Sequence, residues 1–312
     1  MAPRDSRSSD AAPDPNAETR LRRLVDSPSY RIAFEDHDFI MQHEQRAVRL
    51  QLELVKPEAI LREHKIKRTI VVFGGTRIVE PEVARQRVAA LEGEIESTGR
   101  SPKLERQLAV ARSIAAKSHY YDAAREFARL VADSRARGET DYVVVTGGGP
   151  GVMEAANRGA WEAGAPNIGL NITLPFEQRP NSYITPELCF QFHYFAIRKM
   201  HFLLRAQALV AFPGGYGTLD ELFEALTLMQ TGKTTVMPVI LFGRQFWDGI
   251  VDFQRLADEG TIADRDLKLF RYAETPAEAW DIVRRFHAER RRRRREGAKP
   301  KGDEATRRRP RP

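Results

Sequence analysis

Two segments of this chain share one pattern, in which an unbroken run of hydrophobic residues is followed by a glycine-rich turn and then by a helical sequence. The first run, residues 142–145 (YVVV), precedes the turn 147–151 (GGGPG). The second run, residues 208–212 (ALVAF), precedes the turn 213–217 (PGGYG). Short runs without polar positions are typical of strands buried on both faces of a parallel sheet. The pattern therefore predicts an α/β protein.

Three further runs, residues 69–73, 168–174 and 236–242, carry the same strand signal and alternate with helical segments. Strands that alternate with helices predict right-handed crossovers and a doubly wound, Rossmann-like, mainly parallel sheet. We expect this domain over residues 67–287. A helical extension is expected over residues 29–66, ending near Pro57 or shortly after it, because proline interrupts helical hydrogen bonding.

Composition restricts the classes of protein that the chain can belong to. Over its 312 residues, 42% are hydrophobic, enough for a core. The single cysteine, Cys189, excludes an internal disulfide framework and a cysteine-clustered metal site. No apolar stretch approaches the ~20 residues that span a bilayer, and the first ten residues lack the apolar core of a secretory signal. We expect a cytoplasmic protein without membrane contact, metal or cofactor.

The net charge of +7 is concentrated at one end of the chain. Residues 288–312 contain twelve Lys or Arg and four Asp or Glu, a local charge of +8, which leaves −1 for the remainder. We interpret this basic tail as a solvated, disordered extension of a final helix, and residues 1–28 as a disordered N-terminus. The alternative, that the tail contacts nucleic acid through salt-dependent charge attraction, stays open.

The two glycine turns predict a phosphate site. Glycine lets backbone N–H groups approach an anion at the positive end of a helix. The dinucleotide fingerprint fails, because Val152 occupies the position of its third glycine and no acidic residue closes the next strand. The lysine-containing phosphate loop of nucleoside triphosphatases is also missing. The expected ligand is a phosphorylated molecule other than NAD or ATP.

Two charged positions admit two interpretations each. Arg198 and Lys199 fall near the start of a helix that is expected to begin around Tyr194. The helix dipole disfavours cations at that end. Two cations there indicate either a functional site or a helix start that has been predicted in the wrong place. Thr218 and Glu221 match a capping box on spacing alone. However, helices after parallel strands begin at the ligand-binding edge of a sheet, which would bring Arg198, Glu221 and both turns to one rim.

The segment 213–221 (PGGYGTLDE), preceded by Arg198-Lys199-Met200, resembles the signature of the LONELY GUY (LOG) family of nucleoside 5'-monophosphate phosphoribohydrolases, some of which are labelled lysine decarboxylases. The resemblance also covers residues 147–154 and extends over about residues 67–286.

The resemblance implies hydrolysis of the N-glycosidic bond of AMP-like nucleotides or cytokinin ribotides, giving a free base and ribose 5-phosphate without a cofactor. It implies Arg198 and Glu221 as the catalytic pair and a homodimer or larger homo-oligomer. The implied substrate-binding residues are Gly148, Gly149, Lys199, Gly214, Gly215, Gly217 and Thr218.

Shorter members of the family lack the preface before Thr69, the helical stretch around residues 81–118 and the arginine tail. These differences leave open the base preference, the oligomer and the choice between cytokinin activation and nucleotide salvage. A nucleotide-binding sensor or carrier that uses the same pocket without turnover is the alternative function.

Overall fold

The computed structural model describes residues 16–175 and 179–297, and it divides into two units at residues 53 and 54. The described part of the first unit contains helix α1 (Ala17–Val25), the short helix α2 (His37–Ile40) and the beginning of α3 (Arg46–Glu63). No residue of α1 or α2 is buried. The first helix lies within the stretch 1–28 that composition predicts to be disordered; residues 1–15 of that prediction lie outside the described residues.

The helix α3 continues past Pro57 and ends at Glu63, inside the helical extension expected over residues 29–66. Its second half is anchored in the second unit: Leu61 is buried, and the Glu58 carboxylate forms an ion pair with Arg205. These contacts stabilise a helix that proline alone would interrupt.

The second unit is built on a seven-stranded sheet in which every pairing of the described strands is parallel, in the order β4-β3-β2-β1-β5-β6-β7. The strands are β1 (Arg68–Phe73), β2 (Tyr142–Thr146), β3 (Asn167–Ile172), β4 (Cys189–Phe192), β5 (Ala206–Ala211), β6 (Val239–Phe242) and β7 (Phe270–Ala273). This confirms the doubly wound, Rossmann-like prediction, with β4 and β7 as strands that the sequence did not predict.

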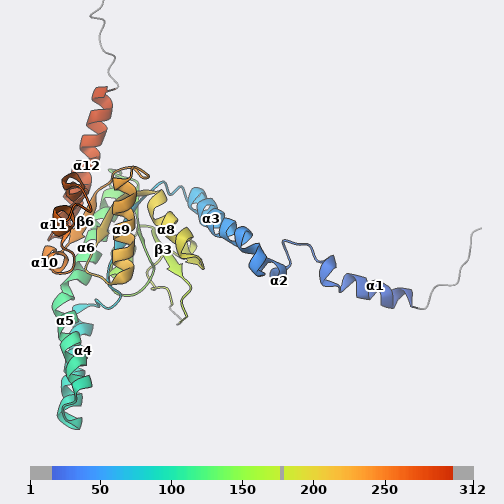
Figure 1. Ribbon diagram of the computed structural model, residues 1–312, viewed down its shortest axis with the longest axis horizontal. Helices are drawn as coiled ribbons and strands as arrows, with labels where there is room; N and C mark the ends of the chain where they lie inside the picture. The colour runs from blue at the N-terminus through green and yellow to red at the C-terminus, as the bar shows by residue number, and fades with distance from the viewer. Residues whose placement is uncertain (1–15, 176–178, 298–312) are drawn as a thin grey trace, which may run out of the picture. The chain divides into compact units, whose positions relative to one another are not determined.

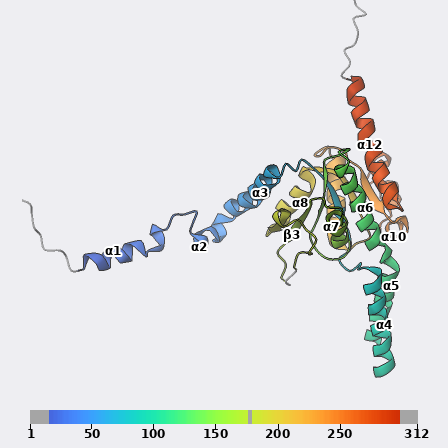
Figure 2. The same cartoon turned by 180° about the vertical axis from the view of Figure 1, so that it is seen from behind.

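Helices cover both faces of this sheet (Figures 1 and 2), as predicted. They are α4 (Pro81–Thr98), α5 (Pro102–Lys117), α6 (His119–Ala136), α7 (Val152–Glu162), α8 (Phe195–Leu204), α9 (Tyr216–Gln230), α10 (Arg244–Asp248), α11 (Phe253–Asp258) and α12 (Pro276–Gly297). On one face α6, α7 and α12 enclose a core that includes Phe127, Phe212 and Trp280. The helices α8 and α9 cover the other face.

Two helical segments reach beyond the sheet. The expected break near Gly99 is present, and α4 and α5 lie side by side as a hairpin (Figure 1). Helix α12 continues to Gly297, ten residues beyond the predicted end of the domain at 287; residues 298–312 of the predicted tail lie outside the described residues. In the part of the chain that the structure describes, no helix combines the length and the apolarity needed to cross a membrane.

The strand order determines where along the carboxyl edge of the sheet a ligand can bind. The chain adds β2, β3 and β4 on one side of β1, and then returns through α8 to add β5, β6 and β7 on the other side. Phe73 at the end of β1 is in register with Ala211 at the end of β5. Because the loops after these two neighbouring strands diverge to opposite faces, a crevice opens at the carboxyl edge between them.

Candidate active site

A cavity of about 690 Å³ occupies this crevice. The loops after β1, β2 and β3 line one part of it, and the facing parts of α8 and α9 line the other. The sequence-predicted residues among its walls are Gly149, Arg198, Gly215, Gly217, Thr218 and Glu221. The structure therefore brings residues of both glycine turns, the cation Arg198 and the carboxylate Glu221 to one cavity.

The N-terminus of α9 forms one wall of the cavity. The helix begins at Tyr216, its N-cap is Gly215, and no side chain of the described residues caps it. The N–H groups of a first helical turn have no partners within the helix, and the helix dipole gives them partial positive charge. This wall therefore offers an anion site that is made by the backbone.

The position at which α9 begins also shows whether Thr218 and Glu221 form a capping box. Thr218 lies inside the first turn rather than at the N-cap, and Glu221 lies in the second turn. The interpretation of Glu221 as a capping residue is therefore wrong. Glu221 is instead 4% exposed, and it faces the cavity.

Arg198 approaches Glu221 from α8. This helix begins at Phe195 with Tyr194 as its N-cap, close to the predicted start, so the cation does lie in the first turns. The Arg198 Nη2 atom lies 3.6 Å from Glu221 Oε1, and the two side chains are 14% and 4% exposed. Its guanidinium carbon lies 5.1 Å from the centre of the Phe195 ring, close enough for cation–π attraction.

Both members of this pair keep unused polar atoms. Among the described residues, neither Arg198 Nε nor Glu221 Oε1 has a hydrogen-bond partner, although both atoms are buried. Buried polar atoms in native proteins are nearly always hydrogen-bonded, so these two atoms indicate a ligand or water in the cavity.

Burial dominates the electrostatics of the pair. It raises the pKa of Glu221 to about 7, against the opposing effect of the Arg198 and Lys199 charges. Burial likewise lowers the pKa of Arg198, partly offset by the Glu221 charge. A carboxyl group that titrates near neutrality can exist in either protonation state at physiological pH, which is typical of acid–base and charge-stabilising residues in active sites.

Three of the predicted substrate-binding residues do not line the cavity. Lys199 is directed toward α9, where its Nζ lies 2.8 Å from Asp220 Oδ1 and 3.0 Å from Glu224 Oε2. Adjacent residues of a helix point about 100° apart, so Arg198 and Lys199 cannot both face the cavity. Gly148 and Gly214 lie behind the cavity wall, against the side chains of Asn171 and Thr218 respectively.

A buried polar network that the sequence analysis missed holds the first glycine turn in place. Thr146 Oγ1 accepts a hydrogen bond from the Gly148 N–H at 2.9 Å and donates to Asn157 Oδ1 at 2.7 Å. The Nδ2 group of Asn181 donates to the same Asn157 oxygen at 2.9 Å and to the Gly149 carbonyl at 3.1 Å. Nothing in local spacing marks these residues, because their partners come from separate segments.

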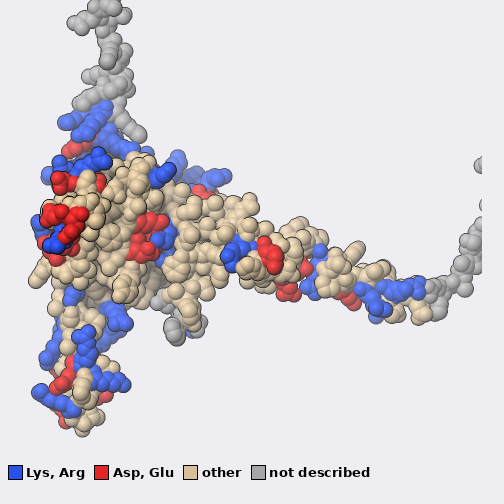
Figure 3. Space-filling model, viewed as in Figure 1, with Lys and Arg blue, Asp and Glu red and all other residues tan. Residues whose placement is uncertain are grey.

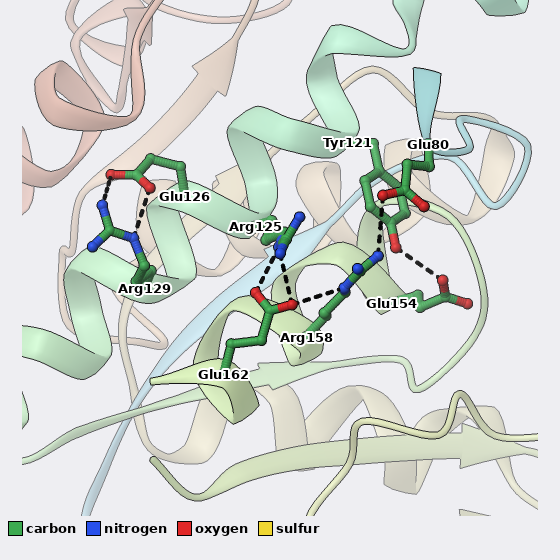
Figure 4. A network of polar contacts seen from close by, with 8 residues as sticks. All are labelled: Glu80, Tyr121, Arg125, Glu126, Arg129, Glu154, Arg158 and Glu162. Atoms are coloured by element: carbon green, nitrogen blue, oxygen red, sulfur yellow. Dashed lines mark hydrogen bonds and ion pairs between the residues drawn. The ribbon is translucent and has the colours of Figure 1, made fainter. Parts of the chain in front are cut away.

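Helix α7, which follows this turn, is braced by a second network (Figure 4). The Tyr121 hydroxyl donates to Glu154 in the first turn of α7 at 2.9 Å. Arg158 links Glu162, on its own helix, to Glu80, which precedes α4. The first glycine turn therefore lies on a rigid support.

The sequence analysis gave no role in the site to several other residues of the cavity wall. Met153, Phe190 and Phe195 line the cavity, together with Asn171, Arg179 and Gln191. Cys189 also lines it, is exposed, and accepts a 3.5 Å contact at its sulfur from Asn171 Nδ2. The usable signal for Asn171 was its position near the carboxyl end of the predicted strand β3, whereas β4, which carries Gln191, was not predicted.

The sequence of this chain matches one family model and is similar to two plant proteins of known name. Residues 153–283 match the family model described as "Possible lysine decarboxylase". A cytokinin riboside 5'-monophosphate phosphoribohydrolase of Arabidopsis thaliana is 29% identical over 157 residues, 47% of this chain and 67% of the relative. A probable cytokinin riboside 5'-monophosphate phosphoribohydrolase of Oryza sativa subsp. japonica is 26% identical over 181 residues, 54% of this chain and 78% of the relative.

Solved structures also match at low similarity. A structural-genomics target, TM1055, is 23% identical with a TM-score of 0.41, covering 70% of this chain and 99% of its own. The molybdenum cofactor carrier protein of Chlamydomonas reinhardtii is 20% identical with a TM-score of 0.40, covering 71% and 99%. Scores of this size support no inference about activity.

Proposed function

We propose that this chain, which belongs to the LONELY GUY (LOG) family, hydrolyses the N-glycosidic bond of nucleoside 5'-monophosphates to a free base and ribose 5-phosphate. Its curated relatives are named for this reaction on cytokinin riboside 5'-monophosphates, which supports a hydrolase of this class. The observation that carries the proposal is the buried Arg198–Glu221 pair, 3.6 Å apart, in the same cavity as the uncapped N-terminus of α9.

The phosphate would bind at the start of α9, on the N–H groups of the first turn and the Thr218 hydroxyl. A β-carbon added to Gly215 or Gly217 would meet no atom of the protein within 4 Å, so open space adjoins both glycines. Holding the phosphate there fixes the ribose ring over the second turn of α9, where Glu221 lies. Such positioning can contribute up to about 7 kcal/mol to catalysis.

Glu221 would act on the charge that develops during bond cleavage. Departure of the base leaves an oxocarbenium-like ribose, and a carboxylate beside it stabilises the positive charge or orients the attacking water. This role requires the ionised form of Glu221. Arg198, at 3.6 Å, would hold that carboxylate in place and donate from its unused Nε–H to the nucleotide.

The direct test is a chromatographic assay of the purified chain with AMP, GMP, IMP, CMP, isopentenyladenosine monophosphate and adenosine. We expect free base from one or more monophosphates and none from adenosine, because adenosine lacks the phosphate that α9 would hold. The ranking of the monophosphates would separate cytokinin activation from nucleotide salvage. Binding of monophosphates without release of base would instead support the sensor or carrier alternative.

We further propose that the chain forms a homodimer or a larger homo-oligomer. Large apolar side chains of α8 and α9 are exposed, including Met200, Leu204 and, at the cavity, Phe195 and Tyr216, which is 92% exposed. Several large exposed apolar side chains on two neighbouring elements favour an association site. Light scattering during size-exclusion chromatography would test this, with a monomer as the contradicting result.

A further inference from the structure

A second cavity, of about 310 Å³, lies at the opposite, amino-terminal edge of the sheet. Its walls come from the starts of β1, β2 and β5, the end of α8, the loop before β6, and the fourth and fifth turns of α12. The polar residues that matter here are Arg68, Tyr142, Gln207, His287, Arg290 and Arg291. The catalytic residues proposed above lie at the other edge, so the two cavities are separate.

The charge in this cavity is strongly one-sided. Three guanidinium groups line it, from Arg68, Arg290 and Arg291, and no Asp or Glu belongs to its walls. Arg68 forms an ion pair with Asp141, whose Oδ1 lies 3.2 Å from Arg68 Nη1 and which is not part of the cavity wall. Among the described residues, no carboxylate forms an ion pair with Arg290 or Arg291. The wall of the cavity is therefore positively charged.

The base of the cavity is built from buried polar side chains. Tyr142 is 4% exposed and His287 is 7% exposed. The Nε2 atom of His287 lies 2.9 Å from the Gln207 carbonyl oxygen, so His287 donates there. Burial, together with the charges of Arg290, Arg291 and Arg68, lowers the pKa of His287, which disfavours the charged ring. The arginines thus lie around a floor of buried polar side chains.

The space-filling view shows Lys and Arg side chains gathered over the C-terminal part of α12 (Figure 3). The helix dipole stabilises cations near the C-terminus of a helix, and this is a structural reason for one or two of the arginines of α12. That reason does not explain Arg68, which belongs to β1 and shares the same cavity. Guanidinium groups from two separate elements therefore converge on one cavity, an arrangement that favours an anionic ligand.

We propose that this cavity binds a small phosphoryl anion of the pyrophosphate class, either inorganic or as part of a free nucleotide. Planar guanidinium groups bind phosphate oxygens in pairs, and several such groups match the many oxygens of a pyrophosphate. A volume of about 310 Å³ is near the lower limit of small-molecule sites and suits a ligand of this size. The site is independent of the catalytic cavity and of the reaction proposed for it.

The test is calorimetric titration of the full chain with inorganic pyrophosphate at low salt. Ribose 5-phosphate is present at saturation, so that the phosphate site proposed at α9 is occupied. We expect the double variant Arg290→Ala/Arg291→Ala to bind pyrophosphate at least tenfold more weakly than the natural chain, because two charge-assisted hydrogen-bonding groups are lost.

The matched control is Arg284→Ala/Arg285→Ala on the same helix. This variant removes the same charge, but Arg284 and Arg285 pair with Asp281 and do not line the cavity. Its affinity should change less than about threefold, since only diffuse charge attraction is reduced. Both double variants should keep any base-release activity, so failure of the proposed reaction would leave this comparison intact.

Two results would overturn the proposal. Equal weakening in both double variants, or no binding of pyrophosphate by the natural chain at millimolar concentration, would mean that no defined site exists. Binding of a 20-nucleotide RNA that depends on Arg290 and Arg291, without pyrophosphate binding, would assign the arginines to an extended polyanion surface instead.

Discussion

The two glycine turns look alike in sequence, but their glycines are required for different reasons. In the first turn, Gly148 and Gly151 both have φ of +73°, and a β-carbon on either would overlap its neighbours, Asn171 in one case and the Gly75 carbonyl in the other. In the second turn, neither Gly215 nor Gly217 has a positive φ, and a β-carbon on either would meet only open space.

This difference separates glycines that the fold itself requires from glycines that leave space for a ligand. The protein's own packing explains the first turn, which supports the wall of the cavity. The protein's packing does not explain Gly215 and Gly217, whose missing side chains leave room beside the first turn of α9. We infer that the first turn is chiefly structural and that the second turn contacts the ligand.

The largest effect should come from the helix behind the second turn. Glu221→Gln keeps the shape of the side chain but removes its charge, so we expect the rate of base release to fall about 10²–10⁴-fold. Nucleotide binding, measured by calorimetry, should survive. Glu224→Gln, one turn further along α9 and outside the cavity wall, is the control and should stay active. Full activity of Glu221→Gln would remove Glu221 from the mechanism.

The first turn is tested by Gly151→Ala, which should lower the free energy of unfolding by about 3 kcal/mol or more. The added methyl group must adopt a disfavoured φ and also overlap the Gly75 carbonyl. Gly99→Ala separates these causes, because Gly99 also has a positive φ, +86°, but no atom lies within 4 Å of its added β-carbon. We expect about 1 kcal/mol for Gly99→Ala in denaturant titrations. Equal losses in both variants would show that the close packing of Gly151 is unimportant.

The second turn is tested by Gly217→Ala, for which the opposite outcome is expected. Stability should be unchanged or slightly increased, because alanine is the better helix former. The KM for the best monophosphate should rise about tenfold or more, because the methyl group would occupy space beside the bound phosphate. Thermal unfolding and steady-state kinetics measure the two effects. A stable variant with normal KM would place the phosphate elsewhere.

The fold could be predicted from the sequence because its strongest signals are local. Buried strands such as β1 and β2 are uninterrupted apolar runs, and glycine marks their ends. The edge strands β4 and β7 were missed because exposed or partly exposed positions interrupt each of them, so neither is an unbroken apolar run. The sequence predicted the end of α3 only loosely, because contacts far along the chain, such as the ion pair between Glu58 and Arg205, stabilise the helix beyond Pro57.

The site could be predicted only in part. Topology correctly brought Arg198, Glu221 and the turns together, since parallel strands end at one edge. The direction of Lys199 depended on the acids Asp220 and Glu224 across the interface between α8 and α9, and no local pattern reveals that pairing. The support from Asn157 and Asn181 was missed for the same reason, because 24 residues separate these partners.

The last and smallest effect concerns pH, and it sharpens the role of the second turn's helix. Burial places the pKa of Glu221 at about 7, so the ionised form should increase about tenfold between pH 6 and pH 8. If the carboxylate stabilises the ribose cation, kcat/KM should rise over that range, and Glu221→Gln should lack this rise.

The free energy of unfolding should fall as the pH rises, because of the same carboxyl group. The folded chain holds a proton on Glu221 that the unfolded chain, with an ordinary pKa of 4.5, releases earlier. Stability of the natural chain relative to Glu221→Gln therefore falls as pH rises from about 4.5 to about 7. A rate that increases with pH while stability declines would tie both effects to one buried carboxyl group, whereas a parallel change in both would point to another residue.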